Sequence, residues 1–543
     1  MTSNAEGPCE SKLPTLLNIG GNLTTSEENA SSTQQITRCP ATSAPQDTQL
    51  QQHEYEAVLD MIGFGCAQWV ILLVCGLLLM VVIDETVGMS IITIASQCDF
   101  ATSAIDKAIM NASSFAGIVI FSYVWGYLSD TVGRRTILLY STSGTSLISV
   151  VSIFIPNYWA FVFMRFVVGV FIAGPSSTTY AYLGEFFTRR HCAIVANYAS
   201  LFVGLGMAYV PAIAWPVLLM DWSLPISDSF AFRPWRLLTL FNLLPGFLGI
   251  GILLLLPDSP KVLLSLGKHD EALSAVNWIC KRNTGKDLKQ IGVEKLKAET
   301  KSEADRVFLT SKSWYDTIKN IWLETRPLFH RPYALNFLIC CTVMAGMFFS
   351  STGMSLWFSE IQNRANSNTN GNHLTICELI DLSIQDDEAI ANSTQSCSDH
   401  ISDKSYIDSI CLGLCFVVGY ALLGPVINIF GRKATIIGSL LLSAVCCILM
   451  LVLVNPMAIV ICFILFVTMP GICISLLGSA VVGLVPTHLR GKAVCICFML
   501  GRAGSIFGSN VIGALLASYC NFTFSFFAGS VMVCICLTMI LPI

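Results

Sequence analysis

The sequence predicts an all-α membrane protein in which twelve transmembrane helices form two pseudo-symmetric bundles of six. The composition supports this class, because 54% of the 543 residues are hydrophobic and only 12% are charged. The mean hydropathy of +0.66 agrees with it. The apolar residues also gather into segments of about 20 residues, the length that crosses about 30 Å of hydrocarbon. Finally, a short motif recurs at the same place in each half.

The apolar segments fall into two groups of six, separated by a long polar stretch. We expect membrane spans at 67–95, 107–128, 136–155, 158–180, 192–219 and 237–256 in the first half, and at 334–358, 406–429, 434–454, 456–482, 493–517 and 523–542 in the second.

The recurring motif has the form G-x-x-x-[D/N]-x-x-G-R-[R/K] and follows the second span of each half. Its copies are Gly126, Asp130, Gly133, Arg134 and Arg135, and Gly424, Asn428, Gly431, Arg432 and Lys433. The glycines suit a tight turn, the Asp or Asn can cap a helix end, and the cations suit a cytoplasmic surface. Because transporter folds are built from internal repeats, the motifs predict a transporter, and we expect them to control gating.

Most of the 31 Lys and Arg residues lie in loops on one side of the predicted membrane. Basic loops stay in the cytoplasm, so both termini should lie there. We expect a disordered cytoplasmic tail at 1–60, helical bundles at 61–256 and 333–543, a cytoplasmic linker with short helices at 257–332, and an extracytosolic loop at 359–405. The chain should be a multi-pass protein of the plasma membrane or of an intracellular vesicle membrane.

The extracytosolic loop carries two cysteines and a glycosylation sequon. Cys377 and Cys397 are candidates for a disulfide, because they share one loop outside the cytosol. Asn392 begins the sequon Asn-Ser-Thr and is a candidate for glycosylation. The sequons at Asn22 and Asn29 lie in the predicted cytoplasmic tail and should stay unmodified.

Other function classes lack their motifs in this sequence. The seven histidines are not clustered and there is no CxxC pair, so no metal site is expected. No nucleophile with a base and no phosphate-binding loop supports an enzyme or a cofactor. A net charge of −4 without a basic tract gives no reason to expect nucleic acid. The expected partners are the lipid bilayer, a small-molecule substrate and a coupling ion, and we expect a monomer.

Three ionisable residues of the first half have similar predicted depths. Asp84 and Glu85 in the first span and Arg165 in the fourth lie roughly 10 to 15 Å from the outer surface, at 1.5 Å per residue. Successive helical residues point about 100° apart, so one acid can face Arg165 while the other faces a cavity. Either the pair only fixes two helices, or it is broken or protonated during transport.

Arg502 lies near the midplane of the eleventh span, and the ninth to eleventh spans contain no carboxylate. An unpaired cation at this depth needs a water-filled cavity or an anionic ligand, so we expect Arg502 to recognise an anion. The alternative is an arginine that caps the carbonyl groups of a broken helix.

Helix breakers occur inside several spans, where they should line a cavity or form a hinge. They are Gly174 and Pro175, Pro211 and Pro216, and Pro470 and Gly471. Tyr198, Tyr209 and Trp357 could form aromatic walls of that cavity, although an aromatic residue in a span more often packs in the core or at the membrane interface.

The paired sequences GYLSDTVGRR and GPVINIFGRK resemble those of the major facilitator superfamily, whose members are two-bundle, rocker-switch carriers. Over about residues 60–543 the chain is similar to the synaptic vesicle glycoproteins and the related organic-ion carriers, through GFGCAQW, MRFVVGVFIAG, PDSPKVLLSLGKHDEAL, STGMSLWFSE and VPTHLRGKA. The resemblance implies the major facilitator fold. It matches Glu85, Arg165 and Trp357 to the family's first-span acid, fourth-span arginine and seventh-span tryptophan. We therefore expect Glu85 to pair with Arg165, leaving Asp84 to face the cavity.

The resemblance implies a transporter that moves a small solute, such as an organic ion, by alternating access. The alternative is a non-transporting, synaptic-vesicle-glycoprotein-like membrane protein that acts as a partner-binding platform. The chain departs from the vesicle glycoproteins, whose large luminal domain is replaced by a short loop after the seventh span. The family's pocket residues also change at Tyr198, Ile474 and Gly478, so the family's ligands are not carried over to this chain.

Overall fold

The computed structural model describes residues 52–220, 222–227, 230–297, 323, 325–367, 374–392, 400–485 and 489–542. Regular structure in this part of the chain is mostly helical. Strand β1 (Gln52–His53) runs parallel to β4 (Lys295–Leu296), and β2 (Leu224–Ser227) forms an antiparallel hairpin with β3 (Phe230–Phe232).

The helices follow the predicted order. The first half contains α1 (Tyr55–Ile62), α2 (Cys66–Thr86), α3 (Met89–Ala95), α4 (Gln97–Phe100), α5 (Ala104–Val132), α6 (Arg134–Ser152), α7 (Tyr158–Gly184), α8 (Arg189–Leu218), α9 (Pro234–Asn242) and α10 (Leu244–Leu253). The linker contributes α11 (Pro260–Ser265), α12 (His269–Thr284), η1 (Leu288–Ile291) and η2 (Arg326–Phe329). The second half contains α15 (Ala334–Ser367), α16 (Ile376–Asn392), α17 (Asp403–Phe430), α18 (Arg432–Met450), α19 (Pro456–Leu484), α20 (Arg490–Leu515) and α21 (Cys520–Ile540).

Eleven helical segments of the described chain are long and apolar enough to cross a membrane, which agrees with an all-α membrane protein. Helix α6, in the place of the predicted third span, has 19 residues but is less apolar, because one side carries buried hydroxyl groups. Ser141 donates to Ile137 O at 2.6 Å and Thr145 to Ser141 O at 2.9 Å. A hydroxyl that bonds back to its own helix can be buried without an unsatisfied group.

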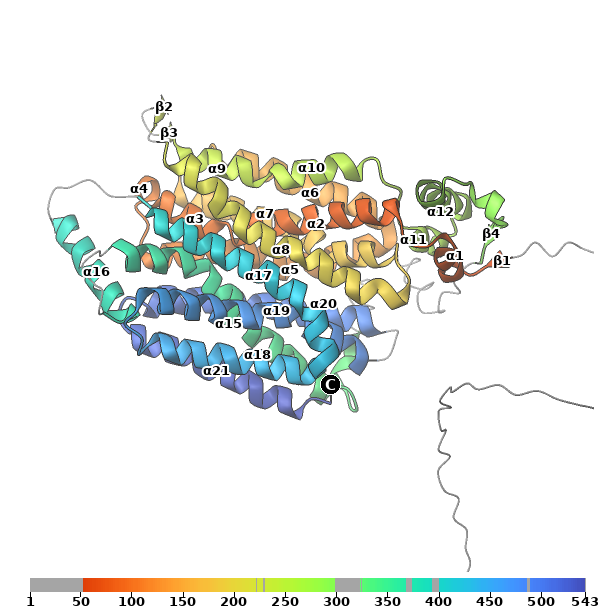
Figure 1. The fold of residues 1–543 in the computed structure, drawn as a ribbon. Helices are drawn as coiled ribbons and strands as arrows, with labels where there is room; N and C mark the ends of the chain where they lie inside the picture. The colour runs from red at the N-terminus through yellow and green to blue at the C-terminus, as the bar shows by residue number, and fades with distance from the viewer. Residues whose placement is uncertain are drawn as a thin grey trace, which may run out of the picture. The chain divides into compact units, whose positions relative to one another are not determined.

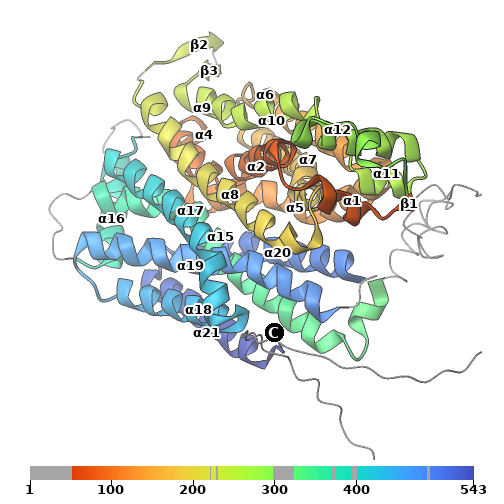
Figure 2. The same ribbon diagram turned by 45° about the vertical axis from the view of Figure 1, so that its right-hand side comes forward.

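The helices of the two halves lie side by side (Figures 1 and 2). In Figure 1 the first half, red to yellow-green, lies above the second half, green to blue. Most contact between the halves comes from two pairs, α5 with α20 and α8 with α17. In the second pair, a Cβ atom added at Gly413 would lie 2.3 Å from Ala208 N. Glycine at this position therefore allows the two helix backbones to approach closely.

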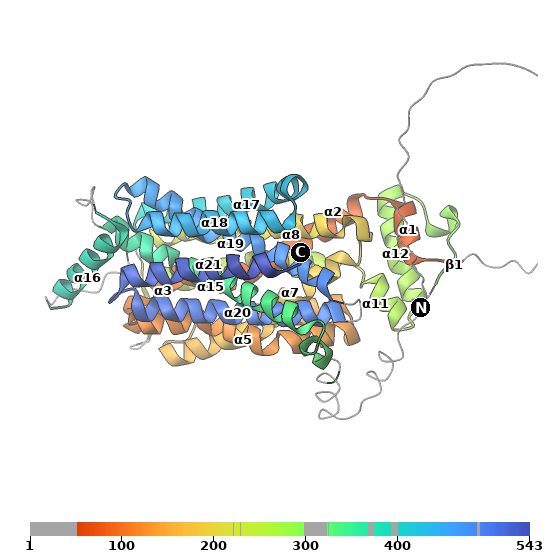
Figure 3. The same ribbon diagram turned by 90° about the horizontal axis from the view of Figure 1, so that it is seen from below.

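Both motifs lie at the same end of the helices, which we call the signature end, and the opposite end is the far end. Gly133 joins α5 to α6 with φ of 119°, and Gly431 joins α17 to α18 with φ of 79°. These angles favour glycine and agree with the tight turns expected from the motif. For Gly126 and Gly424 the expectation is wrong, because they lie inside α5 and α17. Helices α1, α11 and α12 also lie at the signature end (Figure 3).

The predicted boundary of the N-terminal tail at residue 60 is too late. Helix α1 begins at Tyr55, and its Val58, Leu59 and Ile62 are buried in a cluster that includes residues of α12. Their spacing of three and four residues gives α1 one apolar side, which explains why these residues are ordered. Residues 1–51, with Asn22 and Asn29, lie outside the described part.

The disulfide at the far end differs from the predicted one. Cys377, in the first turn of α16, bonds to Cys520 at the start of α21, with a Cα–Cα distance of 5.6 Å. The predicted pairing of Cys377 with Cys397 is therefore wrong, because packing of the helix ends, and not loop spacing, decides which thiols meet. Cys397 lies outside the described residues, and Cys98 is also disulfide-bonded.

The prolines expected to line a cavity or form a hinge do not end their helices, although Pro211 does line a cavity. Helix α7 continues through Pro175, α8 through Pro211 and Pro216, and α19 through Pro470. The breaks fall elsewhere, between α2 and α3 at Val87 and Gly88, and at Leu243 between α9 and α10. Neighbouring helices can satisfy the carbonyl that a proline leaves free, so a buried proline is a poor predictor of a break.

The predicted orientation can be tested by glycan mapping. We expect Asn392→Gln to abolish a glycosidase-sensitive shift in electrophoretic mobility, because its loop should lie outside the cytosol. Asn392 is the last residue of α16, and its side chain lies outside the described part.

The tail sequons supply the matched control. Asn22→Gln and Asn29→Gln should leave the mobility shift unchanged. If the shift were retained in Asn392→Gln and lost in Asn22→Gln, the predicted orientation would be wrong.

Candidate functional site

The first motif forms a charged cluster at the signature end. Arg134 Nη2 lies 3.2 Å from Asp130 Oδ1, and Arg134 Nε lies 2.8 Å from Oε1 of Glu185, which follows α7. Burial raises the pKa of Glu185 to about 7, while the Arg134 guanidinium acts in the opposite direction. Glu185 was missed in the sequence, where its only signal is an acid directly after the fourth span.

The last cation of each motif holds the end of another helix. Arg135 donates from Nε and Nη2 to carbonyl oxygens at the C-terminus of α10, at 3.0 and 2.7 Å. Lys433 Nζ donates to carbonyl oxygens at the C-terminus of α21, at 2.9 and 2.8 Å. Helix C-termini leave carbonyls without intrahelical partners and favour cations. Each motif therefore fastens the third long helix of its half to the sixth.

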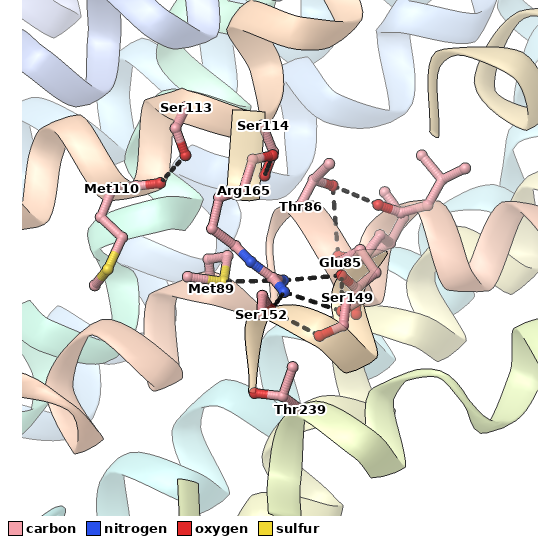
Figure 4. Close-up of polar contacts among 12 residues, drawn as sticks. Glu85, Thr86, Met89, Met110, Ser113, Ser114, Ser149, Ser152, Arg165 and Thr239 are labelled. Carbon is pink, nitrogen blue, oxygen red and sulfur yellow. Dashed lines mark hydrogen bonds and ion pairs between the residues drawn. The ribbon is translucent and has the colours of Figure 1, made fainter. Parts of the chain in front are cut away.

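Glu85 and Arg165 form an ion pair inside the first half (Figure 4). Arg165 Nη1 lies 2.9 Å from Glu85 Oε2, and neither side chain is more than 1% exposed. Ser149 of α6 donates to the same carboxylate oxygen at 2.8 Å. Arg165 Nη2 donates to Ser149 Oγ at 3.0 Å and to Ser152 Oγ. The pair links α2, α6 and α7 and is the pairing expected from the sequence, whereas the two serines were not anticipated.

Asp84 has no comparable partner. Its side chain is fully buried, and neither carboxylate oxygen has a hydrogen-bond partner among the described residues. The carboxylate faces α8, because a Cβ atom added at Gly206 would lie 2.9 Å from Asp84 Oδ1. A buried carboxylate without donors is costly, which makes Asp84 a candidate for ligand contact.

A cavity with an empty volume of about 340 Å³ lies between the two halves. Its walls come from α2, α3 and α8 of the first half and from α15 and α17 of the second. Three of its lining residues, Ile83, Val87 and Gly88, flank Asp84 in the sequence, and a fourth is Gly206. The cavity therefore lies beside the unpaired carboxylate.

Arg502 of α20 reaches across to the first half. Its Nη1 donates to Ser122 Oγ at 3.0 Å, and its Nη2 donates to Ser176 O at 3.3 Å and to Ser176 Oγ. Within the described chain Arg502 forms no ion pair. Because neutral oxygens occupy its donors in this conformation, anion recognition by Arg502 stays a prediction.

The candidate aromatic residues do not line this cavity. Tyr198 is 48% exposed. Trp357 is buried and donates from Nε1 to Ser509 O at 3.0 Å, within the second half. Phe358, the next residue, lines the cavity instead. A ligand contact by Tyr198 or Trp357 therefore remains a prediction.

At the far end, polar contacts connect the halves. Lys107 Nζ of α5 lies 2.9 Å from Glu360 Oε1 of α15, and both side chains are at least nine-tenths buried. Lys107 also donates to Gln97 at 2.8 Å, and Arg364 donates to Glu360 at 2.9 Å. Deeper in the same helix pair, Asn111 Nδ2 donates to a backbone oxygen of α15 at 3.3 Å. These contacts join the two halves at the far end in this conformation.

Comparison with known families and proteins gives a consistent result. Residues 72–372 match the family model described as the Major Facilitator Superfamily. The chain is 27% identical over 329 residues to synaptic vesicle glycoprotein 2B of Homo sapiens, covering 58% of this chain and 48% of that protein. It is 28% identical over 321 residues to synaptic vesicle glycoprotein 2A of Bos taurus, covering 57% and 43%. The chain spans about half the length of the curated relatives it matches.

Solved structures show the same fold. The xylose transporter XylE from E. coli, in a partially occluded inward open conformation, matches with a TM-score of 0.59 at 15% identity. The match covers 87% of this chain and 99% of that one. At this identity the likeness concerns the fold alone, and it confirms the predicted fold class.

The buried ion pair predicts energetic coupling between Glu85 and Arg165. Arg165→Ala should destabilise the protein by about 3–5 kcal/mol, because it strands a buried carboxylate. Adding Glu85→Ala should cost less than the sum of the two single losses. Unfolding of the four proteins of this cycle in detergent measures the coupling.

Asp84→Ala provides the matched comparison, because Asp84 adjoins Glu85 but has no contact with Arg165. It should combine additively with Arg165→Ala. If Arg165→Ala were coupled to Asp84→Ala and additive with Glu85→Ala, Asp84 would be the partner of Arg165 and Glu85 would be the unpaired acid.

Glu185 should make the folded protein less stable as pH rises. Its folded-state pKa of about 7 lies above the ordinary value of 4.5, so the folded state binds more protons between these values. The stability from this group is present below pH 4.5 and lost as pH approaches 7. Glu185→Gln should remove this part of the pH dependence of Tm, whereas Glu271→Gln, at an exposed site of α12, should not. An unchanged slope in Glu185→Gln would show that Glu185 does not titrate in this range.

Proposed function

Because the chain belongs to the major facilitator superfamily, we propose that it is a carrier that moves a small organic ion across a membrane by alternating access. One observation supports this most directly: both halves supply walls to a single cavity, and an unpaired carboxylate lies beside it. Alternating access requires such a site, since each half must be able to move away from the ligand in turn.

Opening of the far end requires the Lys107–Glu360 pair to separate. Opening of the signature end requires Arg502 to leave Ser122 and Ser176 of the first half. Separation leaves the Arg502 guanidinium without those partners, so an anion could then bind it from the signature end. The motif residues Asp130, Arg134 and Glu185 act as a gate that sets the rate of exchange between conformations.

The Glu85–Arg165 pair is the second functional element of the proposal. Protonation of Glu85 would release Arg165, so the pair could couple transport to an ion gradient. The multi-pass chain works as a monomer with cytoplasmic termini, and the names of its curated relatives support a vesicle membrane as its location.

The proposal is tested by uptake of a library of organic ions into vesicles that contain the purified chain. Ser409→Trp should abolish uptake, because the indole fills the cavity at Ser409 of α17. Asp130→Asn should lower the maximal rate and leave the half-saturating concentration nearly unchanged, since it alters the gate and not the cavity.

Ser479→Trp is the matched control, since Ser479 is exposed on α19 and does not line the cavity between the halves. Its uptake should equal that of the unmodified protein. If no library member enters the vesicles while some bind the protein, the result would favour the alternative function, a non-transporting membrane protein that binds partners.

A further inference from the structure

We propose that the cavity between the halves takes a small organic cation with a protonated amine, and that Asp84 provides its countercharge across Gly206. The inference rests on the proposed function, because it names the substrate class of the same cavity. It follows from the polarity of the cavity wall, from the position of Asp84 and from the partners of the nearby cations.

The cavity wall offers serine hydroxyl groups and no charge. None of its lining residues is ionisable, and its polar side chains are four serines. Ser355 donates its hydroxyl proton to Ser351 O at 2.9 Å. Ser359 and Ser409 share a hydrogen bond at 3.2 Å, which uses one of their two protons. The remaining lone pairs of these oxygens suit a ligand that donates, such as an ammonium group.

Asp84 lies directly behind this wall. Gly206 lines the cavity, and a Cβ atom added to it would lie 2.9 Å from Asp84 Oδ1. The absence of a side chain at Gly206 brings the backbone of this cavity-lining residue close to the carboxylate, beside the side chains of Ile83 and Met80. The same carboxylate has no donor among the described residues, so a cation in the cavity would favour its ionised form and pair with it at short range.

Arg165 and Arg502, the basic residues considered as partners of Asp84, donate their hydrogen bonds to other groups. Arg165 donates to Glu85, Ser149 and Ser152. Arg502 donates to Ser122 and Ser176, on α5 and α7, which do not line the cavity. An anionic ligand would be repelled by Asp84, and a neutral ligand would leave Asp84 unpaired. A cation is the class that the cavity favours.

The cavity volume limits the size of the ligand. The cavity is small in this conformation, because the centre of a water-sized sphere can occupy only about 30 Å³ of it, and the larger volume of about 340 Å³ includes space open to solvent. A single-ring or short-chain amine is therefore a suitable probe.

Three probes of nearly equal size separate charge from shape: benzylammonium, benzyl alcohol and benzoate. Added to the purified full chain in detergent, benzylammonium should raise Tm with saturation, because a ligand of the folded state stabilises it. Benzyl alcohol and benzoate should have little effect at the same concentrations. Asp84→Asn should weaken benzylammonium binding by about tenfold or more.

Gly206→Ala tests the same carboxylate without removing it, because the new methyl group covers Asp84. It should also weaken benzylammonium binding, and it keeps the test decisive where Asp84→Asn fails to fold. Gly251→Ala is the matched control, since a Cβ atom at Gly251 of α10 meets nothing within 4 Å. This control should bind benzylammonium as the unmodified protein does.

Stabilisation by benzoate that is lost in Arg502→Ala would overturn the inference in favour of an anion site. Equal binding of benzylammonium by the unmodified protein, Asp84→Asn and Gly206→Ala would also overturn it, as would the absence of any stabilisation by benzylammonium. Benzylammonium binding without uptake would keep the cation site and remove the carrier. Uptake of another solute that is blocked by Ser409→Trp, without binding of benzylammonium, would keep the carrier function and remove the cation site.

Discussion

The ion pair between Glu85 and Arg165 is the contact on which the arrangement of the first half depends. Hydrocarbon supplies no water, so two opposite charges in the core of the helices must satisfy each other and their remaining hydrogen bonds. Ser149 and Ser152 complete the set, and this requirement explains why α6 carries these two hydroxyl groups although it lies among apolar helices. The pair therefore fixes the packing of α2, α6 and α7, and indirectly the direction in which Asp84 points.

The requirement that buried ionisable groups have partners also draws attention to the groups that have no ionic partner. Asp84 and Arg502 have opposite charge and each lacks an ionic partner among the described residues. They differ in their surroundings, because Arg502 is held by oxygens of the opposite half whereas Asp84 is held by nothing in this conformation. A protein that only needed stability would gain by replacing such groups with apolar ones, so their presence is best explained by ligands and by movement.

The fold class could be predicted because composition, span length and an internal repeat each depend on the bilayer and not on details of packing. The pairing of Arg165 with an acid of the first span was also predictable, since depth and helical phase are set by sequence position. The choice of Glu85 over Asp84 came from the resemblance to the family. The partner of Cys377 was not, because Cys520 is distant in sequence and reaches it only through the packing of α16 and α21. The cavity serines and the Lys107–Glu360 pair were missed for the same reason: serine and lysine acquire these roles only when two helices from different halves meet.

The contacts of Arg135 and Lys433 have a mechanical consequence. In both halves the same two helices are joined at the same end, so sliding between them would break two charge-assisted hydrogen bonds. Each half is therefore stiff against shear at the signature end. Because both halves carry equivalent contacts, we expect little slippage between these helices inside either half. The conformational change should then fall on the interface between the halves.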